Sequence, residues 1–542
     1  MPKVVALPDG TLASCVVVHR GPGLGLTPAE QEVSLQYSKD HGQTWSVREM
    51  VARLPAAKGG FGFGVPLADR EGEIHVFLLC DGQTGVIRAR TAPGVAPVEP
   101  MPRQYLGVWY LRSRGQRTAW TEAKPIFDGR ASDLQSACQL RSGRIVLPLA
   151  SWVNRSWRER GEGFAEFTFQ GSFEATAIYS DNGGATWQRS ASTLRIPTPN
   201  LSALGAIEPA IVQLNDDRVW MLIRGQTGVF YESFSTDHAV TWSPPVPSAI
   251  ASSDSPAGFA RLDEKRILLI WNNCRRFPYA LGGRQVLHAA ITEDDGRSWR
   301  GWREVLRDPL RHQPPPPSGD HGVSYPYPAV AANGRVVYSL WVQTGDGRSL
   351  FEIDPRWLLA RHQRDDFADG SSEAWSHFGC RGVGVVAAEG AVGGQALRLA
   401  KADAAWPSGA VRNFPFGRRG TLTLRLRAEP AAGPLRLMLT DHFSPPFDLE
   451  DAAQSVFLTT VAVSPAANAP AIAIAPDRWA TLQLQWDLAA QRCVVSIDGR
   501  QSLQLPAQRR AAGVCYLRLR ADPLPAQAPG YLLDSVEVTV EP

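Results

Sequence analysis

A short turn motif that recurs through the first two-thirds of the chain constrains the fold more than any other feature. The motif has the pattern Ser/Thr-x-Asp-x-Gly-x-Thr/Ser-Trp, and we call it the Asp box. In this pattern Asp and Gly suit a tight turn between two strands, the hydroxyl residue adds local hydrogen bonds, and Trp packs between neighbouring sheets. The copies are SKDHGQTW (38–45), SDNGGATW (180–187), STDHAVTW (235–242) and TEDDGRSW (292–299), with a degenerate copy, SRGQRTAW, at 113–120.

The stretch 208–242 contains one complete repeat of the unit that carries this motif. PAIVQL is apolar, NDD is typical of a turn, RVWMLIR is apolar again, and VFYESFS alternates apolar with polar residues. Apolar runs bounded by turn residues, and alternation with a period of two, are typical of β-strands. The stretch therefore predicts three successive strands that end on an Asp box.

Six turns of the Asp-Gly type, each between two apolar runs, predict six such sheets. Internal repeats of this size in an all-β pattern are typical of a β-propeller. We therefore predict an all-β chain in which residues 1–360 form a six-bladed β-propeller. The six turns are Asp9-Gly10, Glu71-Gly72, Ser142-Gly143, Asp216-Asp217, Asp263-Glu264 and Asn333-Gly334.

The pattern changes after residue 360, where the Asp boxes stop. Short alternating runs such as TLTLRLRAE, WATLQLQWDL and LDSVEVTVE follow. Such runs, separated by turn residues, predict a concanavalin-like β-sandwich (jelly roll) over residues 361–542. This domain is expected to be either a structural brace for the propeller or a carbohydrate-binding module.

Composition limits the classes of partner and of site. A formal net charge of +3 over 542 residues gives no reason to expect a nucleic-acid partner. The seven cysteines are scattered and never form a C-x-x-C pair, so we expect buried thiols and no metal site. No apolar run reaches the roughly 18 residues that a membrane helix needs. No nucleotide-binding loop or metal cluster is visible, so we expect no cofactor.

The N-terminus leaves the cellular location open. It lacks a basic segment followed by an apolar one, so no signal peptide is visible. We expect a secreted or periplasmic protein if the natural N-terminus is longer, and a cytoplasmic one otherwise. The oligomeric state is not predicted.

The propeller geometry indicates where a ligand site would lie. In each blade the innermost strand begins, and the second strand ends, at the same rim of the central funnel, so residues at those positions converge. They include arginines, carboxylates, a tyrosine pair and a tryptophan, which suit an anionic sugar. The rim set is His19, Arg20, Asp81, Asp133, Gln135, Trp152, Glu208, Arg224, Ser255, Asn272, Asn273 and Tyr325 or Tyr327.

With its Asp boxes and this rim set, the chain resembles the sialidase (neuraminidase) superfamily over about residues 2 to 359. The resemblance implies arginines that bind the substrate carboxylate, a Glu-Tyr pair that supplies the nucleophile, and an Asp as acid/base. Glu208, in IEPAIVQL, matches the glutamate. Arg224 and Arg284 match two arginines of the family's triad. The tyrosine falls in SYPYPAV, where Tyr325 is slightly favoured over Tyr327 by its distance to the next turn.

Two further roles that the resemblance implies have no direct match. The family carries an arginine in an R-I-P motif before the first strand, whereas this chain begins MPKVV; Arg20 is the candidate replacement. The acid/base Asp expected ahead of the first Asp box is absent, and Asp81 from the next blade is the candidate for it. Asn272 and Trp152 complete the predicted substrate-binding set.

These residue types fit an exo-acting glycoside hydrolase that removes a terminal acidic sugar from a glycan, most simply an α-linked sialic acid. Guanidinium groups bind a carboxylate bidentately. A neutral phenol is a poor nucleophile and needs an adjacent base, and it suits an anomeric centre that already bears a carboxylate. Two alternatives remain. One is a lyase or glycosidase acting on uronate-containing polysaccharide, and the other is a carbohydrate-binding propeller without catalysis.

Overall fold

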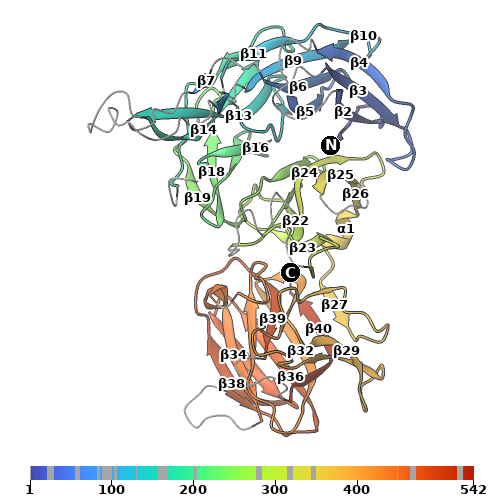
Figure 1. Ribbon diagram of the computed structural model, residues 1–542, viewed down its shortest axis with the longest axis vertical. Coiled ribbons are helices and arrows are strands. Elements are labelled where there is room, and N and C mark those ends of the chain that lie inside the picture. The colour runs from blue at the N-terminus through green and yellow to red at the C-terminus, as the bar shows by residue number, and fades with distance from the viewer. Residues whose placement is uncertain are drawn as a thin grey trace, which may run out of the picture.

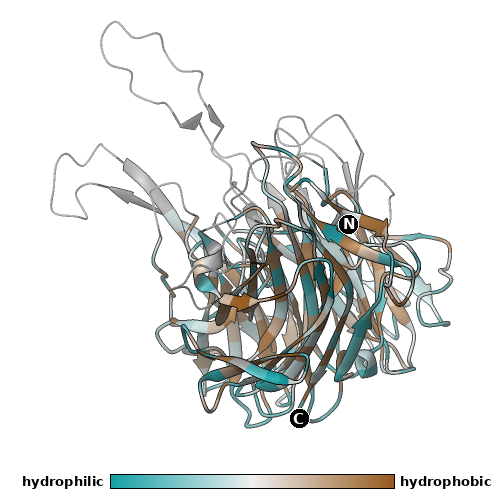
Figure 2. Ribbon diagram, turned by 90° about the horizontal axis from the view of Figure 1, so that it is seen from below, coloured by the Kyte–Doolittle hydropathy of each residue, from teal (hydrophilic) through white to brown (hydrophobic). Residues whose placement is uncertain are grey.

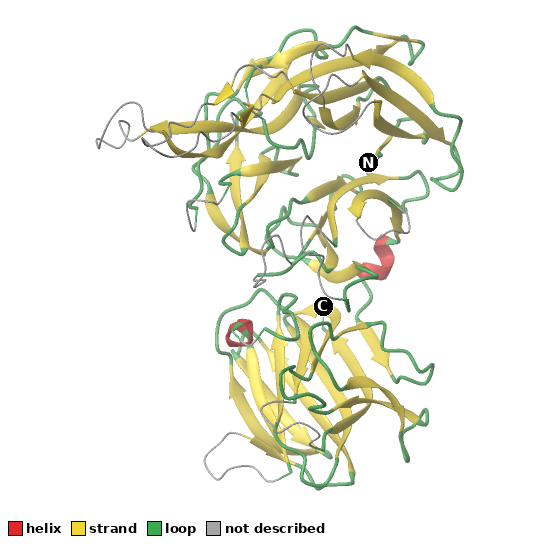
Figure 3. Ribbon diagram, in the orientation of Figure 1, coloured by secondary structure: helices red, strands yellow, loops and turns green. Residues whose placement is uncertain are grey.

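The structure is a computed structural model in which strands make up nearly all of the regular structure (Figures 1 and 3). Six small sheets come first along the chain, and two larger sheets follow, as predicted. The described residues are 2–20, 30–54, 61–81, 86–87, 101–102, 106–129, 131–156, 168–198, 204–275, 283–313, 322–342, 349–448, 450–463, 471–521 and 529–541.

The six small sheets are the propeller blades, and in each the strands run antiparallel in chain order from the innermost strand outward. The first three blades are β1 (Lys3–Ala6), β2 (Leu12–Arg20), β3 (Glu30–Ser38), β4 (Glu49–Leu54); β5 (Phe61–Ala68), β6 (Ile74–Asp81), β9 (Leu106–Arg114), β10 (Ala119–Trp120), β11 (Lys124–Phe127); and β12 (Cys138–Gln139), β13 (Ile145–Ser156), β14 (Thr168–Ser180), β15 (Gln188–Arg189). A separate two-stranded sheet pairs β7 (Val86–Ile87) with β8 (Met101–Pro102).

The last three blades carry most of the predicted site. They are β16 (Ile207–Gln213), β17 (Val219–Arg224), β18 (Val229–Ser235), β19 (Val246–Ala251); β20 (Gly258–Arg261), β21 (Ile267–Trp271), β22 (Val286–Thr292), β23 (Arg300–Arg307); and β24 (Val323–Val330), β25 (Val336–Val342), β26 (Leu350–Ile353). A short helix, α1 (Pro355–Leu358), follows.

The Asp boxes form the turns that were predicted. In the first copy the Ser38 hydroxyl donates to Asp40, at 2.8 Å, and accepts from the backbone N–H of Gly42. Asp40 in turn accepts from the backbone N–H of Thr44 at 2.9 Å. The same bonds recur at 235–241 and 292–298, so one local network explains why the motif repeats.

The degenerate copy at 113–120 keeps its turn with a carboxylate from the residue directly before β6. Its Ser113 hydroxyl bonds the carboxylate of Glu73, which also accepts from the backbone N–H of Gln116 at 2.8 Å. Glu73 thus accepts the hydrogen bonds that the Asp accepts in the other copies. This explains how a copy without the Asp still forms the turn.

The ring closes by packing the first blade against the last. Val4 and Leu12 form one buried cluster with Ala329, Ala331 and Val337. The N-terminus accordingly lies beside β24 and β25 (Figure 1). The described strands of the sixth blade are β24, β25 and β26, and no described strand from the N-terminus pairs with them. The ring is therefore closed by apolar packing and not by a shared sheet.

The two larger sheets stack as a β-sandwich below the propeller in Figure 1. The first contains β27 (His362–Asp365), β29 (Val383–Ala387), β30 (Gln395–Leu399), β32 (Arg419–Ala428), β36 (Trp479–Asp487), β37 (Arg492–Ile497), β38 (Arg500–Pro506) and β40 (Tyr531–Val540). The second contains β28 (Trp375–Ser376), β31 (Gly409–Gly417), β33 (Leu435–Thr440), β34 (Phe457–Ala462), β35 (Ala471–Ala473) and β39 (Val514–Arg520), and a 3-10 helix, η3 (Asp451–Gln454), precedes β34.

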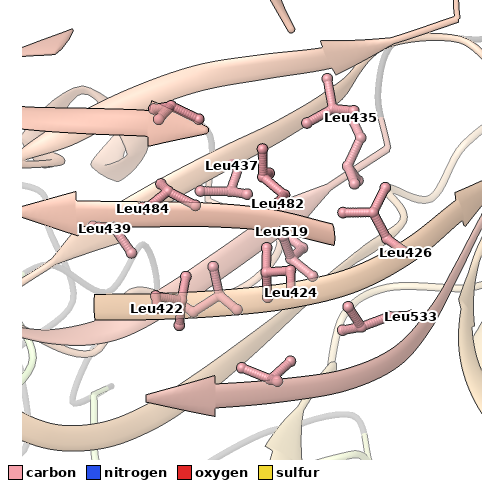
Figure 4. Close-up of a cluster of buried hydrophobic side chains, with 14 of the residues drawn as sticks. Leu422, Leu424, Leu426, Leu435, Leu437, Leu439, Leu482, Leu484, Leu519 and Leu533 are labelled. Atoms are coloured by element: carbon pink, nitrogen blue, oxygen red, sulfur yellow. The ribbon is translucent and has the colours of Figure 1, made fainter. Parts of the chain in front are cut away.

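Alternating burial builds the sandwich core. Every second residue of β32 is buried, and the same alternation runs along β36. In Figure 2 the strands accordingly carry both hydrophobic (brown) and hydrophilic (teal) residues. Leucines from facing strands meet in the core, among them Leu424, Leu437 and Leu482 (Figure 4). A period of two places one face of each strand against the opposite sheet.

A buried chain of hydrogen bonds joins the sandwich to the fifth blade. His288 of β22 accepts from the backbone N–H of Asn273 at Nδ1, so its Nε2–H donates to the hydroxyl of Tyr516, on β39. The Tyr516 hydroxyl donates to Glu304 of β23 at 2.7 Å, and Arg307 donates to the same carboxylate at 2.6 Å. Both ring nitrogens of His288, the Tyr516 hydroxyl and both carboxylate oxygens of Glu304 are therefore hydrogen-bonded, as a buried network requires.

Further contacts surround this chain. Trp302 of β23 stacks on Phe416 of β31, with ring centroids 4.8 Å apart. The side chain of Asn413 accepts from the backbone N–H of Glu304 at 3.0 Å, and the backbone N–H of Phe443 donates to Asn273 O at 2.8 Å. The sandwich is therefore fixed to the fifth blade by both apolar and polar contacts.

The buried histidine predicts a specific pH dependence of stability. Burial lowers the pKa of His288 from 6.5 to about 4, against the nearby charge of Glu304, which raises it; Arg307 and His442 lower it further. Between those pH values His288 binds a proton in the unfolded protein but stays neutral in the folded protein. The free energy of unfolding should therefore fall on acidification from pH 6.5 to 4, by about 3 kcal/mol in total from this group.

The comparison of wild type with His288→Gln measures this contribution. The variant should show a flatter fall in the free energy of urea unfolding between pH 6.5 and 4. Equal slopes for the two proteins would show that His288 is not the buried neutral group that the contacts describe.

The expectations about membrane helices and cysteines can be compared with the structure. Within the part of the chain that the structure describes, no helix is both long and apolar enough to span a membrane. Among the described cysteines, Cys15, Cys274, Cys493 and Cys515 have buried thiols, as expected, whereas Cys138 and Cys380 are only partly buried.

Candidate functional site

Two β-bulges turn the predicted Glu and Tyr out of their strands. On β16 the pairing advances three residues, from Ile207 to Ala210, while the partner strand β17 advances only two, from Arg224 to Leu222. The extra residue forms a bulge, and Glu208 lies in it. On β24 the same shift extrudes Tyr325. Glu208 and Tyr325 have φ angles of 47° and 59°, in the left-handed region that residues other than glycine rarely adopt. Both residues precede a proline, which cannot donate to the ladder and is tolerated at a bulge.

The bulges bring Glu208, Tyr325 and Arg224 into one hydrogen-bonded triangle. The Tyr325 hydroxyl donates to Glu208 Oε1 at 3.0 Å. Arg224 Nη1, at the end of β17, donates to Glu208 Oε2 at 2.5 Å and to the Tyr325 hydroxyl oxygen at 3.0 Å. These three residues come from two blades and are separated by up to 117 positions in sequence. A phenol held between a carboxylate and a guanidinium is arranged to lose its proton to the carboxylate.

Electrostatics keep the phenol protonated until it reacts. Burial raises the pKa of Tyr325, the charge of Glu208 raises it further, and Arg224 and Arg284 lower it by less. Burial lowers the pKa of Arg224, but the charges of Glu208, Tyr325 and Asp254 outweigh it and raise that pKa well above its ordinary value. Arg224 is therefore a permanent cation, and the tyrosine needs a base at the moment of attack.

Arg284 lies beneath the tyrosine ring. Its guanidinium carbon is 5.4 Å from the centroid of the Tyr325 ring, and its Nη2 donates to the backbone carbonyl of Asp254 at 2.7 Å. The side chain is fully buried. Arg224 and Arg284, the two arginines that the resemblance selected, thus both lie against Tyr325.

Tyr327 occupies a different environment from Tyr325. It has rejoined the ladder opposite Ser339, and its ring lies in the core of the first blades. Its hydroxyl donates to the backbone carbonyl of Pro66 at 2.5 Å, and the ammonium of Lys3 lies 5.1 Å from its ring centroid. Among the described hydrogen bonds, the Tyr325 hydroxyl bonds Glu208 and the Tyr327 hydroxyl does not, so Tyr325 is the tyrosine that can lose its proton to Glu208.

Asn272 was expected to bind substrate, but its contacts are structural. Its amide N–H groups donate to the backbone carbonyls of Val286 and Val323, each at 2.8 Å, and its carbonyl accepts from the Ser255 hydroxyl at 2.8 Å. Both amide hydrogens are used, and the residue is fully buried. Asn272 holds the fifth and sixth blades together.

Three predicted site residues remain, which are Trp152, Arg20 and Asp81. Trp152, on β13, is half-buried and meets Phe173 edge-on with ring centroids 5.1 Å apart, in a cluster that includes Ile207. Arg20 ends β2 and Asp81 ends β6. The side chains of Arg20 and Asp81 lie outside the described part of the structure, so their roles stay predictions.

Sequence reasoning missed two charged residues of the site. Asp254 accepts from Arg224 Nε at 2.7 Å; the rim rule had selected its neighbour Ser255. Lys3 is buried on β1, and its Nζ donates to the backbone carbonyl of Leu134 at 2.8 Å. Burial lowers the pKa of Lys3 to about 8, against the charges of Asp133 and Glu208. A polar residue inside an apolar strand was the signal that could have singled out Lys3.

No metal centre emerges from the described residues. Among them, no group of three or more His, Cys, Asp or Glu side chains is placed to hold a metal ion.

Comparison with known proteins gives three findings. The family model described as a BNR repeat-like domain matches residues 25–338. A sialidase of Micromonospora viridifaciens is 24% identical over 329 residues, which are 55% of this chain and 45% of that protein, so the chain spans less than half of that relative's length. Similar solved structures include a protein of unknown function from Dyadobacter fermentans (17% identity, 65% of this chain, 92% of that one, TM-score 0.45) and a Trypanosoma rangeli sialidase (14%, 99%, 90%, TM-score 0.43).

Proposed function

The chain belongs to the BNR repeat-like domain family, and from this membership and the Glu208–Tyr325–Arg224 triangle we propose that it is an exo-acting glycoside hydrolase that removes a terminal α-linked sialic acid. The observation that carries the proposal is the 3.0 Å hydrogen bond from the Tyr325 hydroxyl to Glu208, with Arg224 bonded to both. A distant sialidase relative supports the same class of activity.

In the first step the Tyr325 oxygen attacks the anomeric carbon of the sugar. Glu208 accepts the phenolic proton, the bond from the anomeric carbon to the aglycone oxygen breaks, and an acid protonates that oxygen. In the second step water attacks the same carbon, and the bond from that carbon to the Tyr325 oxygen breaks. Glu208 returns its proton to the tyrosine, and the acid deprotonated in the first step accepts the proton of the water. A neutral nucleophile suits this centre because the sugar carboxylate next to it repels an anionic one.

Arg224 and Arg284 bind the sugar carboxylate in this proposal. Arg224 uses Nε for Asp254 and Nη1 for Glu208 and Tyr325, and its Nη2 makes no hydrogen bond to a described residue. The Nη2 hydrogens are thus available to a ligand. Burial of the pair strengthens its attraction for a carboxylate, because charges interact more strongly where water is excluded.

The acid that protonates the leaving group is assigned to Asp81 as a proposal from sequence alone. The residue ends β6 of the second blade, at the rim end of that strand. Its contribution is separable from that of Tyr325, because an acid matters less when the leaving group is already acidic. Asp81→Ala should therefore slow hydrolysis of natural sialosides more than hydrolysis of an aryl sialoside.

Release of 4-methylumbelliferone from its α-sialoside tests the proposed function. The wild-type protein should turn this substrate over, and Asp263→Asn, a change in the hairpin between β20 and β21, should leave the rate unchanged. Release from the corresponding β-glucuronide and not from the sialoside would contradict the sialic acid assignment and favour a uronate-containing substrate.

A further inference from the structure

Asp254 touches both arginines of the site through different atoms. Its carboxylate oxygen Oδ1 accepts from Arg224 Nε at 2.7 Å, and its backbone carbonyl accepts from Arg284 Nη2 at 2.7 Å. The residue lies between β19 and β20, where the chain passes from the fourth blade to the fifth. Arg224 belongs to the fourth blade, and Arg284 lies two residues before the third strand of the fifth.

The loop that carries Asp254 is itself fixed on both sides. The backbone N–H of Ser253 donates to the backbone carbonyl of Asn272 at 3.2 Å, and the Ser255 hydroxyl donates to the Asn272 side chain at 2.8 Å. The two serine hydroxyls also lie 3.0 Å apart. Since Asn272 is tied to the backbones of two neighbouring strands, Asp254 stands on a rigid base.

A second residue holds the carboxylate of Asp254. Gln226 Nε2 donates to the same Oδ1 at 3.2 Å, and Gln226 Oε1 accepts from the backbone N–H of Gly205 at 3.1 Å. Burial raises the pKa of Asp254, but the charge of Arg224 and the hydrogen bonds from Arg224 and Gln226 outweigh it, so that pKa lies below its ordinary value. Asp254 is therefore an anionic acceptor and unsuited to the role of general acid.

We propose that Asp254 is a positioning residue that sets the separation and the orientation of Arg224 and Arg284, so that together they bind a ligand carboxylate. This inference rests on the proposed function for the identity of the ligand. A bond to Nε fixes the plane of the Arg224 guanidinium and turns Nη1 toward Glu208 and Tyr325. Two guanidinium groups tied to one rigid residue keep a constant spacing, which binding of a planar carboxylate by both requires.

The experiment compares wild type, Asp254→Ala, Asp254→Asn and the control Asp263→Asn. Affinity for N-acetylneuraminic acid, for its methyl ester and for glucuronic acid is measured by calorimetry, and turnover of the 4-methylumbelliferyl α-sialoside is measured in parallel. Asp254→Ala should weaken binding of the free acid by about 10- to 100-fold and raise KM, because misplaced arginines lose their shared contact with the carboxylate. Binding of the methyl ester should stay unchanged.

Asp254→Asn keeps an oxygen acceptor in the same place and should recover part of the loss. Its affinity should lie between those of wild type and Asp254→Ala, whereas a merely structural role would move affinity for the acid and its ester together. Thermal unfolding identifies a variant that does not fold. In that case Gln226→Ala, which loosens Asp254 and leaves both arginines in place, should weaken binding of the acid by a few-fold.

The outcomes separate this inference from the proposed function. If wild type turns over the sialoside and both Asp254 variants match Asp263→Asn in affinity for the acid and in turnover, the inference is overturned and the proposed function stands. Absence of sialoside turnover, with glucuronate binding that Asp254→Ala weakens, overturns the function and supports the inference. Failure of wild type to bind either acid overturns both.

Discussion

Tyr325→Phe should abolish turnover of an α-sialoside and leave binding of sialic acid nearly intact. The change removes one oxygen, which is the proposed nucleophile and the donor of the 3.0 Å bond to Glu208. The ring and its contact with Arg284 are retained, so the arginines proposed to bind the sugar carboxylate stay in place. The fall in kcat should be about 1,000-fold or more, because loss of a nucleophile removes the whole covalent route and not a part of it.

Tyr327→Phe is the matched control for this variant. It removes the same atom two residues along β24, where the hydroxyl bonds the backbone carbonyl of Pro66 and does not contact Glu208. We expect wild-type kcat and a small loss of stability, about 1 kcal/mol, for the lost buried hydrogen bond. A large fall in kcat for Tyr327→Phe with none for Tyr325→Phe would reverse the assignment of the nucleophile.

Arg224→Ala has the second-largest expected effect, because Arg224 joins three groups of the site. Its loss removes a proposed ligand for the sugar carboxylate and leaves Glu208 and Asp254 without their shared cation. We expect kcat/KM to fall by about 100-fold or more and stability to fall by about 3 to 5 kcal/mol, the usual cost of breaking a buried ion pair from one side. Steady-state kinetics and urea unfolding measure the two effects.

Arg266→Ala is the control for the removal of an arginine. Arg266 pairs with Asp263 at 2.6 Å on the exposed hairpin of the fifth blade. Such exposed pairs contribute little, so activity should be unchanged and stability should change by less than about 1 kcal/mol. Arg224→Lys retains a charge but not the fork of donors, and activity near wild type in that variant would contradict the geometry assigned to Arg224.

The propeller could be predicted from the sequence because its signal is local. The Asp box depends on hydrogen bonds within seven residues, so each intact copy is legible without knowledge of the rest of the chain. The degenerate copy shows the limit of this reasoning. There the carboxylate comes from Glu73, 40 residues before Ser113, and only the folded pairing of β6 with β9 brings the two together.

The site was predicted in outline because blade geometry repeats. Glu208, Arg224, Arg284 and Tyr325 lie together, as expected from the rim positions and the resemblance. The choice between Tyr325 and Tyr327 required the bulge on β24. A signal for it was present in the sequence, since Glu208-Pro209 and Tyr325-Pro326 occupy equivalent positions in their blades.

The orientations of the Asn272 and Asp254 side chains could not be predicted from the sequence. Position at the rim does not reveal whether a side chain turns toward a ligand or toward neighbouring backbone carbonyls. Asn272 turns to the carbonyls of Val286 and Val323, whereas Asp254, one residue from the predicted Ser255, turns to Arg224. Such orientations depend on contacts between blades, which no local pattern encodes.

The most direct test of the central claim is to trap the covalent intermediate. A 2,3-difluorosialic acid has a good leaving group at the anomeric carbon and a fluorine beside it that slows hydrolysis of the glycosyl-enzyme. Peptide mass spectrometry of the treated wild-type protein should show one sialyl adduct on Tyr325, absent from Tyr325→Phe and retained in Tyr327→Phe. A protein that turns over the α-sialoside but carries the adduct on another residue would contradict the account.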